Sequence, residues 1–447
     1  MIEKVNITSE QRSALDAMGI DKLNDMQQKA LQAFREGGDM VVLSPTGTGK
    51  TLAFLLPLLE TLKSSEHGIG AVAVLPTREL ARQVADVWKM MNSGLKAVCL
   101  HGGRSVNEEL SLIKGGVPSL VIATPGRLND HLSRGTIDIK NVKVIILDEF
   151  DKALELGFKE EMEQLLAQLP QKARRFLLSA TDSDELSRFL PSGAATRLDF
   201  TDTADKPQER TAFYVVNTTQ KERLHALASL LCLMRGEQAI VFCNFREMVE
   251  EVYRHLKKSG ISVTAYHGGL EQKQRELALY KFKSGCSTVL VCTDLASRGL
   301  DIPDVRHVVH YQRPINQEAF THRNGRTARW SAEGAVYMLR IDGGEMPEYT
   351  PEDIQEFNLA VSIPMPAKPT RKVVYIGKGK RDKISRGDIA GFFMKKGGAK
   401  PDDLGTIVVY DRYAYVAIQN SKLRSILSAV SGEKIKGLKT IIEEIKA

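Results

Sequence analysis

The sequence contains no apolar run that approaches the length of a membrane span, and its start lacks a basic-then-apolar signal segment. Its five cysteines form no CxxC pair, and four of them lie in apolar runs that resemble buried strands or helices. This spacing argues against a zinc site or a disulfide framework and favours reduced core thiols. We therefore expect a soluble protein of the cytoplasm.

An excess of either charge is also missing from most of the chain. Residues 1–369 carry 45 Lys/Arg and 47 Asp/Glu, whereas residues 370–447 carry 17 Lys/Arg and 8 Asp/Glu. The net charge of +7 therefore originates in the C-terminal tail, which predicts an appendage that binds a polyanion. With 447 residues, 43% of them hydrophobic, the chain is long enough for two or three domains.

Short apolar runs alternate with amphipathic stretches in two long series, after a helical pattern that extends from Leu15 to Phe34 with a break near Gly19. The strands expected in the first series are 40–43, 71–75, 97–100, 120–123, 144–147 and 176–178. The strands expected in the second series are 213–216, 239–242, 263–266, 288–292, 305–311 and 334–339. Such alternation predicts βαβ units, and therefore two α/β domains that are each built on a parallel sheet.

Two polar stretches without periodicity predict linkers at 201–210 and 346–370. The predicted domains are accordingly 1–200, 211–345 and 371–447. The last of these mixes apolar runs with a short helical pattern, so we expect a small α+β domain.

The stretch Ser44–Thr51, which reads SPTGTGKT, lies between an expected buried strand and an apolar helix. A Gly-rich turn at a helix N-terminus directs backbone N–H groups at phosphate oxygens. Lys50 would reach the β- and γ-phosphates, and the Thr51 hydroxyl would bind Mg²⁺. Ser44 stands where the usual motif has Gly, and the alternative is a tight turn with an incidental lysine. The other residues expected to hold the nucleotide in this turn are Thr46, Gly47, Thr48 and Gly49.

Residues 144–147 predict a buried strand that ends in two acids, Asp148 and Glu149. A carboxylate at this place can hold the Mg²⁺ of a bound nucleotide, which is the role we assign to Asp148, and Glu149 can polarise the attacking water. The alternative is a pair of acids that caps a helix. Because the pair follows a phosphate-binding turn by about a hundred residues, we favour the ATPase interpretation.

With these motifs, residues 1–340 resemble a DEAD-box RNA helicase in the order and spacing of the whole series. The motifs are SPTGTGKT at 44–51, PTRELA at 76–81, GG at 102–103, TPGR at 124–127, DEFD at 148–151, SAT at 179–181, QKQR at 272–275, TDLASRGLD at 293–301 and HRNGRTAR at 322–329. The resemblance implies two tandem RecA-like domains, ATP and Mg²⁺ as cofactors, and RNA as the partner.

Two positions depart from the family pattern. Gln27 takes the adenine-reading position, but the family's upstream aromatic is missing, because no aromatic residue precedes Phe34. Phe150 replaces the usual Ala of the acidic motif, while the three acids around it are retained. The acids are the chemically needed members, so we expect activity to survive.

The resemblance also implies roles for single residues. Arg326 and Arg329 match the arginine fingers that neutralise charge on the transferring phosphoryl group, and Asp301 matches a ribose contact. Ser179 and Thr181 would couple hydrolysis to domain closure. The residues that match backbone contacts with RNA are Arg78, Gly102, Gly103, Thr124, Arg127, Arg275 and Thr293.

The tail resembles RNA-binding domains. Residues 374–376 and 413–416 partly match the two sheet motifs of an RNA-recognition (RRM-like) fold, which stacks bases on aromatic side chains, and tyrosines buried in the protein are the alternative. Residues 376–391 match the C-terminal domain of the DbpA subfamily, which recognises a hairpin of 23S ribosomal RNA, although residues 442–445 are acidic where the relatives tend to be basic. The basic residues expected to contact RNA are Lys378, Lys380, Arg381, Lys383 and Arg386.

These observations together predict an ATP-dependent RNA helicase that unwinds structured 23S rRNA during assembly of the large ribosomal subunit. We expect it to act as a monomer on pre-50S particles. Two alternatives stay open. One is a non-enzymatic RNA-binding or assembly factor with a decayed ATPase, which the missing upstream aromatic and Phe150 favour. The other is a DNA helicase or remodelling ATPase on a related core.

Overall fold

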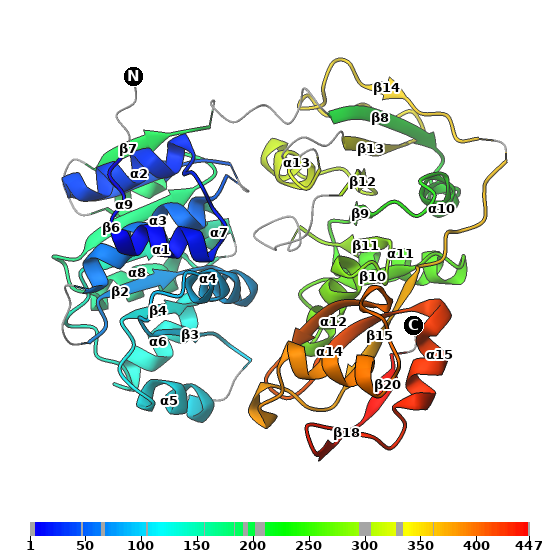
Figure 1. The fold of residues 1–447 in the computed structure, drawn as a ribbon. Helices are drawn as coiled ribbons and strands as arrows, with labels where there is room; N and C mark the ends of the chain where they lie inside the picture. The colour runs from blue at the N-terminus through cyan, green and yellow to red at the C-terminus, as the bar shows by residue number, and fades with distance from the viewer. Residues whose placement is uncertain are drawn as a thin grey trace. The chain divides into compact units, whose positions relative to one another are not determined.

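The structure is a computed structural model, and it describes residues 5–45, 48–63, 68–103, 106–155, 157–182, 184–190, 195–201, 211–294, 305–327, 334–360 and 362–445. The described residues up to Thr201 form one compact unit, and those from Thr211 onward form a second (Figure 1). Each unit contains a seven-stranded parallel sheet, and the second unit also contains a small antiparallel sheet. The expected α/β fold class is therefore confirmed.

The sheet of the first unit has the strand order β3-β4-β2-β5-β6-β1-β7, with all neighbours parallel. Its strands are β1 (Met40–Leu43), β2 (Ala71–Val74), β3 (Ala97–Leu100), β4 (Leu120–Ala123), β5 (Val144–Leu147), β6 (Arg174–Ser179) and β7 (Thr196–Asp199). The six strands expected from sequence are all present, and β7 is an addition. It is an edge strand of mixed polar character, which an apolar run does not reveal.

Helices cover both faces of this sheet. They are α1 (Ser9–Ala17), α2 (Asp25–Glu36), α3 (Lys50–Lys63), α4 (Arg78–Met90), α5 (Val106–Lys114), α6 (Pro125–Ser133), α7 (Phe150–Glu155), α8 (Lys159–Gln168) and α9 (Asp184–Arg188). Successive residues of β1 alternate between two cores: Val42 packs in one cluster, and Val41 and Leu43 pack in the other. Because both faces of the strand are buried, its sequence is apolar throughout.

The second unit repeats this architecture in the order β10-β11-β9-β12-β13-β8-β14, again with parallel neighbours. Its strands are β8 (Thr211–Thr218), β9 (Ala239–Phe242), β10 (Val263–Tyr266), β11 (Val289–Cys292), β12 (His307–His310), β13 (Gly334–Ile341) and β14 (Gln355–Glu356). Its helices are α10 (Arg223–Leu233), α11 (Arg246–Lys258), α12 (Gln272–Lys283) and α13 (Gln317–Asn324).

The tail folds as the expected small α+β domain, with a four-stranded antiparallel sheet in the order β16-β17-β15-β20. Its elements are β15 (Arg371–Ile376), the 3₁₀ turn η2 (Lys380–Asp382), α14 (Arg386–Lys395), the 3₁₀ turn η3 (Pro401–Asp403), β16 (Leu404–Val409), β17 (Ala414–Gln419), α15 (Asn420–Ala429), β18 (Lys434–Ile435), β19 (Leu438–Lys439) and β20 (Ile442–Glu444). Without the short β18–β19 hairpin, the chain order is β-α-β-β-α-β, as in ferredoxin-like and RRM-like folds.

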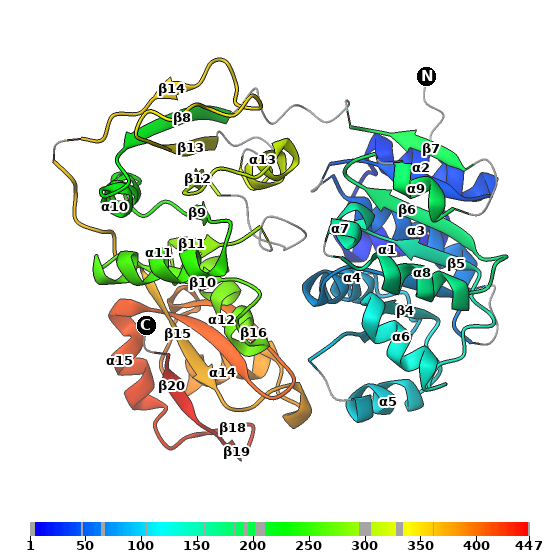
Figure 2. The same cartoon turned by 180° about the vertical axis from the view of Figure 1, so that it is seen from behind.

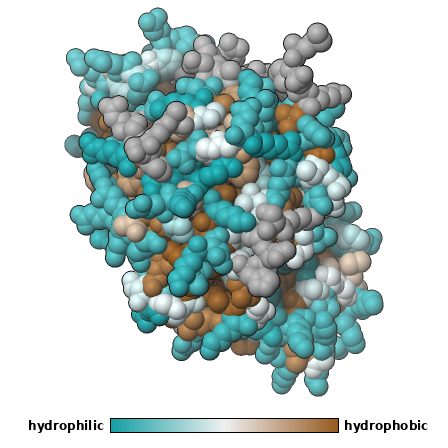
Figure 3. Space-filling model, turned by 90° about the vertical axis from the view of Figure 1, so that its left-hand side faces the viewer, coloured by the Kyte–Doolittle hydropathy of each residue, from teal (hydrophilic) through white to brown (hydrophobic). Residues whose placement is uncertain are grey.

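The surface of the molecule is predominantly hydrophilic on the face in Figure 3, with hydrophobic side chains in small patches. Among the helices of the described residues, none combines the length and apolar character that a membrane crossing requires.

Candidate functional site

The phosphate-binding turn follows β1 at the carboxyl edge of the first sheet, and Lys50 begins α3. The Lys50 side chain is 5% exposed, and its Nζ donates to the Ser44 carbonyl oxygen at 2.8 Å. Ser44 is buried, and its hydroxyl lies 2.8 Å from the Thr48 hydroxyl, so this unusual residue tightens the turn. Thr51 follows Lys50 in the first turn of α3, whereas Thr46 and Gly47 lie outside the described residues.

Gln27 of α2 forms a hydrogen bond with this turn. Its Nε2 donates to the Gly49 carbonyl oxygen at 3.3 Å, and its Oε1 accepts from the Asn24 backbone N–H at 3.0 Å. Gly49 has a φ of +89°, and a Cβ on it would lie 2.5 Å from Gln27 Nε2. Asn24 also donates to the Thr48 carbonyl oxygen at 2.8 Å. The amide predicted to read adenine is therefore adjacent to the turn, and that role stays a prediction.

Asp148 and Glu149 follow β5, and β6 separates β5 from β1 in the sheet. Both acids are buried, and Glu149 lies 3.8 Å from Lys50 Nζ. Burial raises the pKa of Asp148 to about 7, and the charge of Glu149 adds to this rise, while Lys50 and Lys152 oppose it. Two carboxylates and two lysines thus share one buried site, which is a common property of catalytic centres.

Lys152 is the one functional candidate in this group that sequence reasoning missed. Its side chain is 2% exposed and forms an ion pair with Glu149. Burial lowers the pKa of Lys152, which the charge of Glu149 opposes. Glu149 has a φ of +52°, a backbone conformation that non-glycine residues seldom adopt. The available signal was a lysine three residues after the acid in the sequence.

Phe150 packs away from these charges. It is fully buried in the core on one face of the sheet, with its ring edge-on to Phe189 at 4.6 Å between centroids. The departure from the family's Ala is therefore accommodated by core packing and leaves the acids in place. This removes one of the two features that favoured a decayed ATPase.

Ser179 and Thr181 follow β6 and connect to the acidic motif through Asp151. The Thr181 hydroxyl donates to Asp151 Oδ2 at 3.4 Å, and the Ala180 backbone N–H donates to the same oxygen at 3.2 Å. Ser179 is fully buried, and its hydroxyl donates to the Thr181 carbonyl oxygen at 2.6 Å. The backbone N–H of Ser44 also donates to the Ser179 carbonyl oxygen at 3.0 Å, so the 179–181 motif contacts both the 44–51 turn and the acidic motif.

Three of the residues predicted to bind RNA lie together in the first unit. A Cβ built on Gly102 would lie 2.7 Å from Arg78 Nη2, and one built on Gly103 would lie 3.1 Å from Arg78 Nη1. Gly103 also has a φ of +96°. A side chain at either position would therefore displace the Arg78 guanidinium, and the positive φ of Gly103 itself favours glycine.

Arg127 forms ion pairs with two acidic side chains of the same unit. Its Nε donates to Glu109 Oε2 at 2.6 Å, and its Nη1 lies 3.2 Å from Asp130 Oδ2. Burial alone raises the pKa of Glu109, but hydrogen bonds from His131 and Arg127 outweigh it, so the net shift is downward. Thr124 is the N-cap residue of α6, next to this group. Arg127 therefore has a structural partner, and RNA contact stays a prediction.

In the second unit, a buried arginine joins the ends of three strands. Arg323 of α13 is fully buried and donates to Asp294 after β11 at 2.6 and 2.7 Å. It also donates to the Asn244 side chain after β9 at 2.8 Å and to the Gln312 carbonyl oxygen after β12 at 3.0 Å. Sequence reasoning quoted this arginine without a role, because its partners are distant in sequence.

Two predicted residues of this unit, Thr293 and Arg326, lie next to Arg323 or to its partner Asp294. Thr293 precedes Asp294, and Arg326 is 2% exposed, with its backbone N–H donating to the Arg323 carbonyl oxygen at 3.2 Å. Arg275 lies half-buried in the first turn of α12. Asp301 and Arg329 lie outside the described residues.

The predicted basic loop of the tail is exposed. Lys380, Arg381, Lys383 and Arg386 are exposed, whereas Lys378 is partly buried and forms an ion pair with Asp382 at 2.9 Å. A Cβ on Gly379, which begins this loop, would lie 2.3 Å from the Tyr410 carbonyl oxygen, so the loop conformation depends on glycine.

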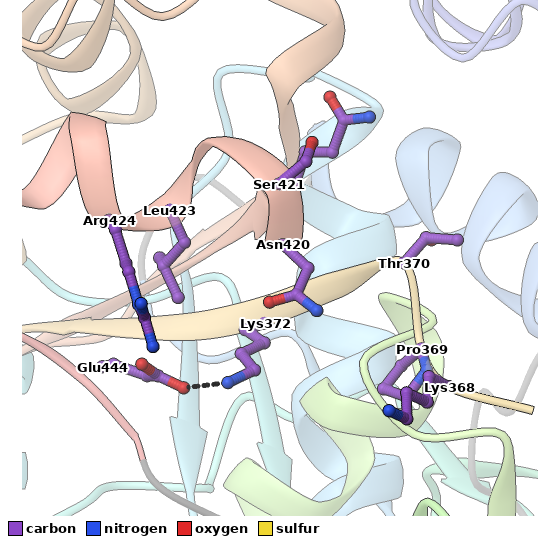
Figure 4. Close-up of a pocket in the computed structure, with 10 residues that line it drawn as sticks. Lys368, Pro369, Thr370, Lys372, Asn420, Ser421, Leu423, Arg424 and Glu444 are labelled. Atoms are coloured by element: carbon purple, nitrogen blue, oxygen red, sulfur yellow. Dashed lines mark hydrogen bonds and ion pairs between the residues drawn. The ribbon is translucent and has the colours of Figure 1, made fainter.

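The acidic end of the tail has a structural explanation. Glu444 belongs to β20, which pairs with β15, and it forms an ion pair with Lys372 at 2.6 Å. Figure 4 shows this pair at the wall of a cavity of about 640 Å³, with Arg424 on the opposite side of Glu444. The acid therefore reduces the positive charge of this cavity.

Comparison with protein families matches three consecutive parts of the chain. Residues 24–189 match the DEAD/DEAH box helicase domain, 222–331 match the helicase conserved C-terminal domain, and 374–444 match the DbpA RNA-binding domain.

Individual relatives agree with these matches. The ATP-dependent RNA helicase DbpA of Escherichia coli is 31% identical over 96% of this chain and 95% of its own length. The DEAD-box ATP-dependent RNA helicase RhpA of Helicobacter pylori is 37% identical over 72% of this chain, and the match spans only 65% of RhpA. The structure of Mss116p bound to single-stranded RNA and AMP-PNP is similar with a TM-score of 0.69 and 27% identity, covering 79% of this chain and 78% of that one.

Proposed function

Because the chain belongs to the DEAD-box ATP-dependent RNA helicases and contains the RNA-binding domain of the DbpA group, we propose that it is an RNA-dependent ATPase that locally unwinds structured ribosomal RNA. We further propose that this RNA is 23S rRNA in pre-50S particles, with the protein acting as a monomer in the cytoplasm. The nearly full-length similarity to a helicase named DbpA supports this choice of RNA.

The proposed ATP site is the turn after β1 with the acids after β5. Lys50 would leave its contact with the Ser44 carbonyl oxygen to neutralise the β- and γ-phosphates, since it is the buried cation nearest to the turn. Glu149 would orient and deprotonate the attacking water, and Lys152 would hold that carboxylate in place. Gln27 would read adenine from its position beside Gly49.

Thr51 and Asp148 fit a divalent cation. Burial makes the charged form of Asp148 unfavourable, and a bound cation would stabilise it, so the donor set matches a site completed by metal. When bound with the nucleotide, Mg²⁺ neutralises charge that develops on the phosphate oxygens. The hydroxyl and carboxylate oxygens of these two residues are ligands that Mg²⁺ prefers.

The remaining roles complete the mechanism. Arg326 and Arg329 would act as arginine fingers, and Asp301 would bind the ribose. Ser179 and Thr181 would transmit the state of the nucleotide through Asp151 of the acidic motif, which accepts from the Thr181 hydroxyl and the Ala180 backbone N–H. Arg78, Gly102, Gly103, Thr124, Arg127, Arg275 and Thr293 would bind the RNA backbone. In this proposal the domains are 1–200, 211–345 and 371–447, with the tail adding RNA preference.

The observation that most supports this proposal is the buried group of Lys50, Asp148 and Glu149 at the edge of one sheet. The test is steady-state ATP turnover with and without a 23S rRNA transcript. We expect stimulation by the transcript, and we expect Glu149→Gln to abolish turnover while nucleotide binding is retained. Absence of stimulation by any ribosomal RNA fragment would refute the ribosomal assignment.

Competition between matched RNA and DNA duplexes separates this proposal from a DNA helicase. We expect RNA to stimulate turnover and DNA of the same sequence not to do so. The decayed-ATPase alternative predicts no turnover with either duplex.

A further inference from the structure

Helix α5 buries an acid and exposes a leucine. Of the residues of α5, all of which the structure describes, only Glu109 is buried, whereas Leu112 is 44% exposed. Surface helices usually bury apolar side chains instead, and a buried carboxylate is unfavourable unless charged or polar partners surround it. In Figure 2, α5 lies beside α6 at the lower end of the first unit. The partners of Glu109 therefore explain how α5 is held.

The Glu109 carboxylate joins two segments of the first unit. Its Oε1 accepts from the backbone N–H of His101, which directly follows β3, at 3.1 Å. Its Oε2 accepts from Arg127 Nε of α6 at 2.6 Å and lies 2.8 Å from His131 Nε2 of the same helix. Because an ionised carboxylate can only accept, both of these nitrogens donate to it. One buried side chain thus connects the end of β3 with α6.

Glu109 extends a connection that the strands begin. β3 and β4 are neighbours in the sheet, and the Thr124 backbone N–H after β4 donates to the Leu100 carbonyl oxygen at 3.1 Å. Beyond this point, Glu109 binds His101 on one side and Arg127 on the other. The loop after β3 and the start of α6 are therefore held at a fixed separation.

Both segments carry residues that we propose to bind the RNA backbone. Gly102 follows His101 and lies against Arg78. Arg127 follows Thr124, which is the N-cap residue of α6. A site built from several contacts binds best when supporting hydrogen bonds hold those contacts in place. The bonds of Glu109 are of this supporting kind, since its own side chain is fully buried.

We propose that Glu109 is a positioning residue for RNA, which keeps the loop after β3 and the start of α6 in register so that both engage one RNA strand together. This inference rests on the RNA contacts proposed above. Glu109 acts only through the residues that it holds, and it lies outside the proposed ATP site. Its loss should accordingly weaken RNA binding and leave the use of ATP unchanged.

A glutamine cannot replace this acid fully. A carboxylate has two accepting oxygens, whereas an amide has one oxygen and an NH₂ group that donates. If the amide oxygen accepted from Arg127, the NH₂ group would face the His101 backbone N–H. If the oxygen accepted from His101, the NH₂ group would face Arg127 Nε. Glu109→Gln therefore keeps the size of the side chain and releases one of the two segments.

RNA-stimulated ATP turnover of the full chain tests this role, with a mixed-sequence single-stranded RNA as the probe. We expect Glu109→Gln to raise the RNA concentration for half-maximal stimulation at least fivefold, and to leave kcat at saturating RNA and the KM for ATP within twofold. Asp130→Asn is the matched control, because it removes the other acid partner of Arg127 and leaves the bond to His101 in place. We expect a smaller rise in this control.

Three results would overturn the proposal. They are an unchanged RNA requirement in Glu109→Gln, an equal rise in Asp130→Asn, and a loss of ATP affinity in Glu109→Gln as large as the loss of RNA affinity. The last result would show that Glu109 serves the stability of the unit as a whole.

Hydrogen exchange followed by mass spectrometry tests the link between the segments without RNA. Arg127→Met should raise the exchange of peptides that cover residues 98–103, because Glu109 loses a partner in α6 and holds His101 less firmly. Arg134→Met is the control, since Arg134 pairs with Asp130, and it should leave this exchange unchanged. Equal exchange in the parent and in Arg127→Met would contradict the link.

Glu109→Gln serves in the same assay if Arg127→Met does not fold. We expect raised exchange in peptides of 98–103 or of 124–131, and unchanged exchange in both would contradict the link. If RNA does not stimulate the parent, the proposed function fails, whereas the exchange result still decides whether Glu109 connects the two segments.

Discussion

Charged side chains inside the first unit are held in pairs. Glu149 contacts Lys152 and lies near Lys50, while Glu109 binds Arg127 and His131. A buried charge without a partner is strongly unfavourable. The stability of the unit and the arrangement of side chains in the proposed ATP site therefore depend on the same few residues.

Lys152→Met should show how much the pair of Lys152 with Glu149 contributes to stability and to ATP turnover. It removes the closest cation from the buried Glu149 carboxylate, whereas Lys50 lies 3.8 Å away. We therefore expect a loss of roughly 3 kcal/mol in the free energy of unfolding and at least a tenfold fall in kcat. Chemical denaturation and steady-state kinetics measure both. Adding Glu149→Gln should restore much of the stability and none of the turnover. Additive losses in the double variant would contradict the pairing.

Asp148 gives a prediction about pH. Because burial raises its pKa to about 7, the folded protein binds a proton that the unfolded chain releases near its ordinary pKa of 3.8. Stability from this group is therefore complete below about pH 4 and is lost as the pH rises through 7. Asp148→Asn should raise the free energy of unfolding at pH 8 by at most about 4 kcal/mol, with no gain near pH 4. A gain independent of pH would argue against this cause.

At the scale of elements, the ends of β1, β5 and β6 bring together motifs that are distant in sequence. β6 lies between the other two, and its last residue, Ser179, pairs with Leu43 at the end of β1. In parallel sheets, ligands bind beyond the carboxyl ends of the strands. The motifs at 44–51, 148–151 and 179–181 are therefore neighbours because of the strand order.

Phe150→Ala restores the family's usual residue, yet we expect it to destabilise the protein. The ring is fully buried against Phe189, so its removal leaves a cavity. Phe-to-Ala changes in cores cost about 3–5 kcal/mol. Denaturant unfolding measures this cost, and Phe150→Leu is a control that should lose less. Unchanged stability in Phe150→Ala would show that the ring contributes no packing.

Features that depend on residues close together in the sequence could be predicted, whereas contacts between distant segments could not. Buried strands such as β1 and β5 were predicted to the residue, because both faces of each are apolar. The edge strand β7 was missed, since its residues are only half-buried or exposed. The ion pair of Arg127 with Glu109 and the cover of Tyr415 by Tyr280 could not be predicted, because each joins segments that only folding brings together.

For the whole molecule, we propose that the tail provides RNA preference while the two parallel-sheet domains provide ATP turnover. We expect deletion of 371–447 to leave weak, non-specific RNA-stimulated ATPase activity and to remove the preference for 23S rRNA. Turnover with the rRNA transcript and with a mixed-sequence RNA measures this. Retention of the preference after deletion would place it in the core.

Binding of the rRNA by the full chain should also depend steeply on salt. Several phosphate contacts through the exposed Lys380, Arg381, Lys383 and Arg386 imply a loss of orders of magnitude between low and moderate ionic strength. A titration at several salt concentrations measures the slope, and Lys380→Glu with Lys383→Glu should flatten it. A slope near zero in the parent would contradict an electrostatic RNA surface.

We propose above all that hydrolysis of one nucleoside triphosphate, bound beside Lys50, drives the unwinding of RNA. The most direct test is ATP turnover by Lys50→Ala in the presence of saturating 23S rRNA transcript. We expect this variant to lose nearly all RNA-stimulated turnover while its fold, followed by circular dichroism, is retained. Turnover by a folded Lys50→Ala variant as fast as that of the parent would contradict it.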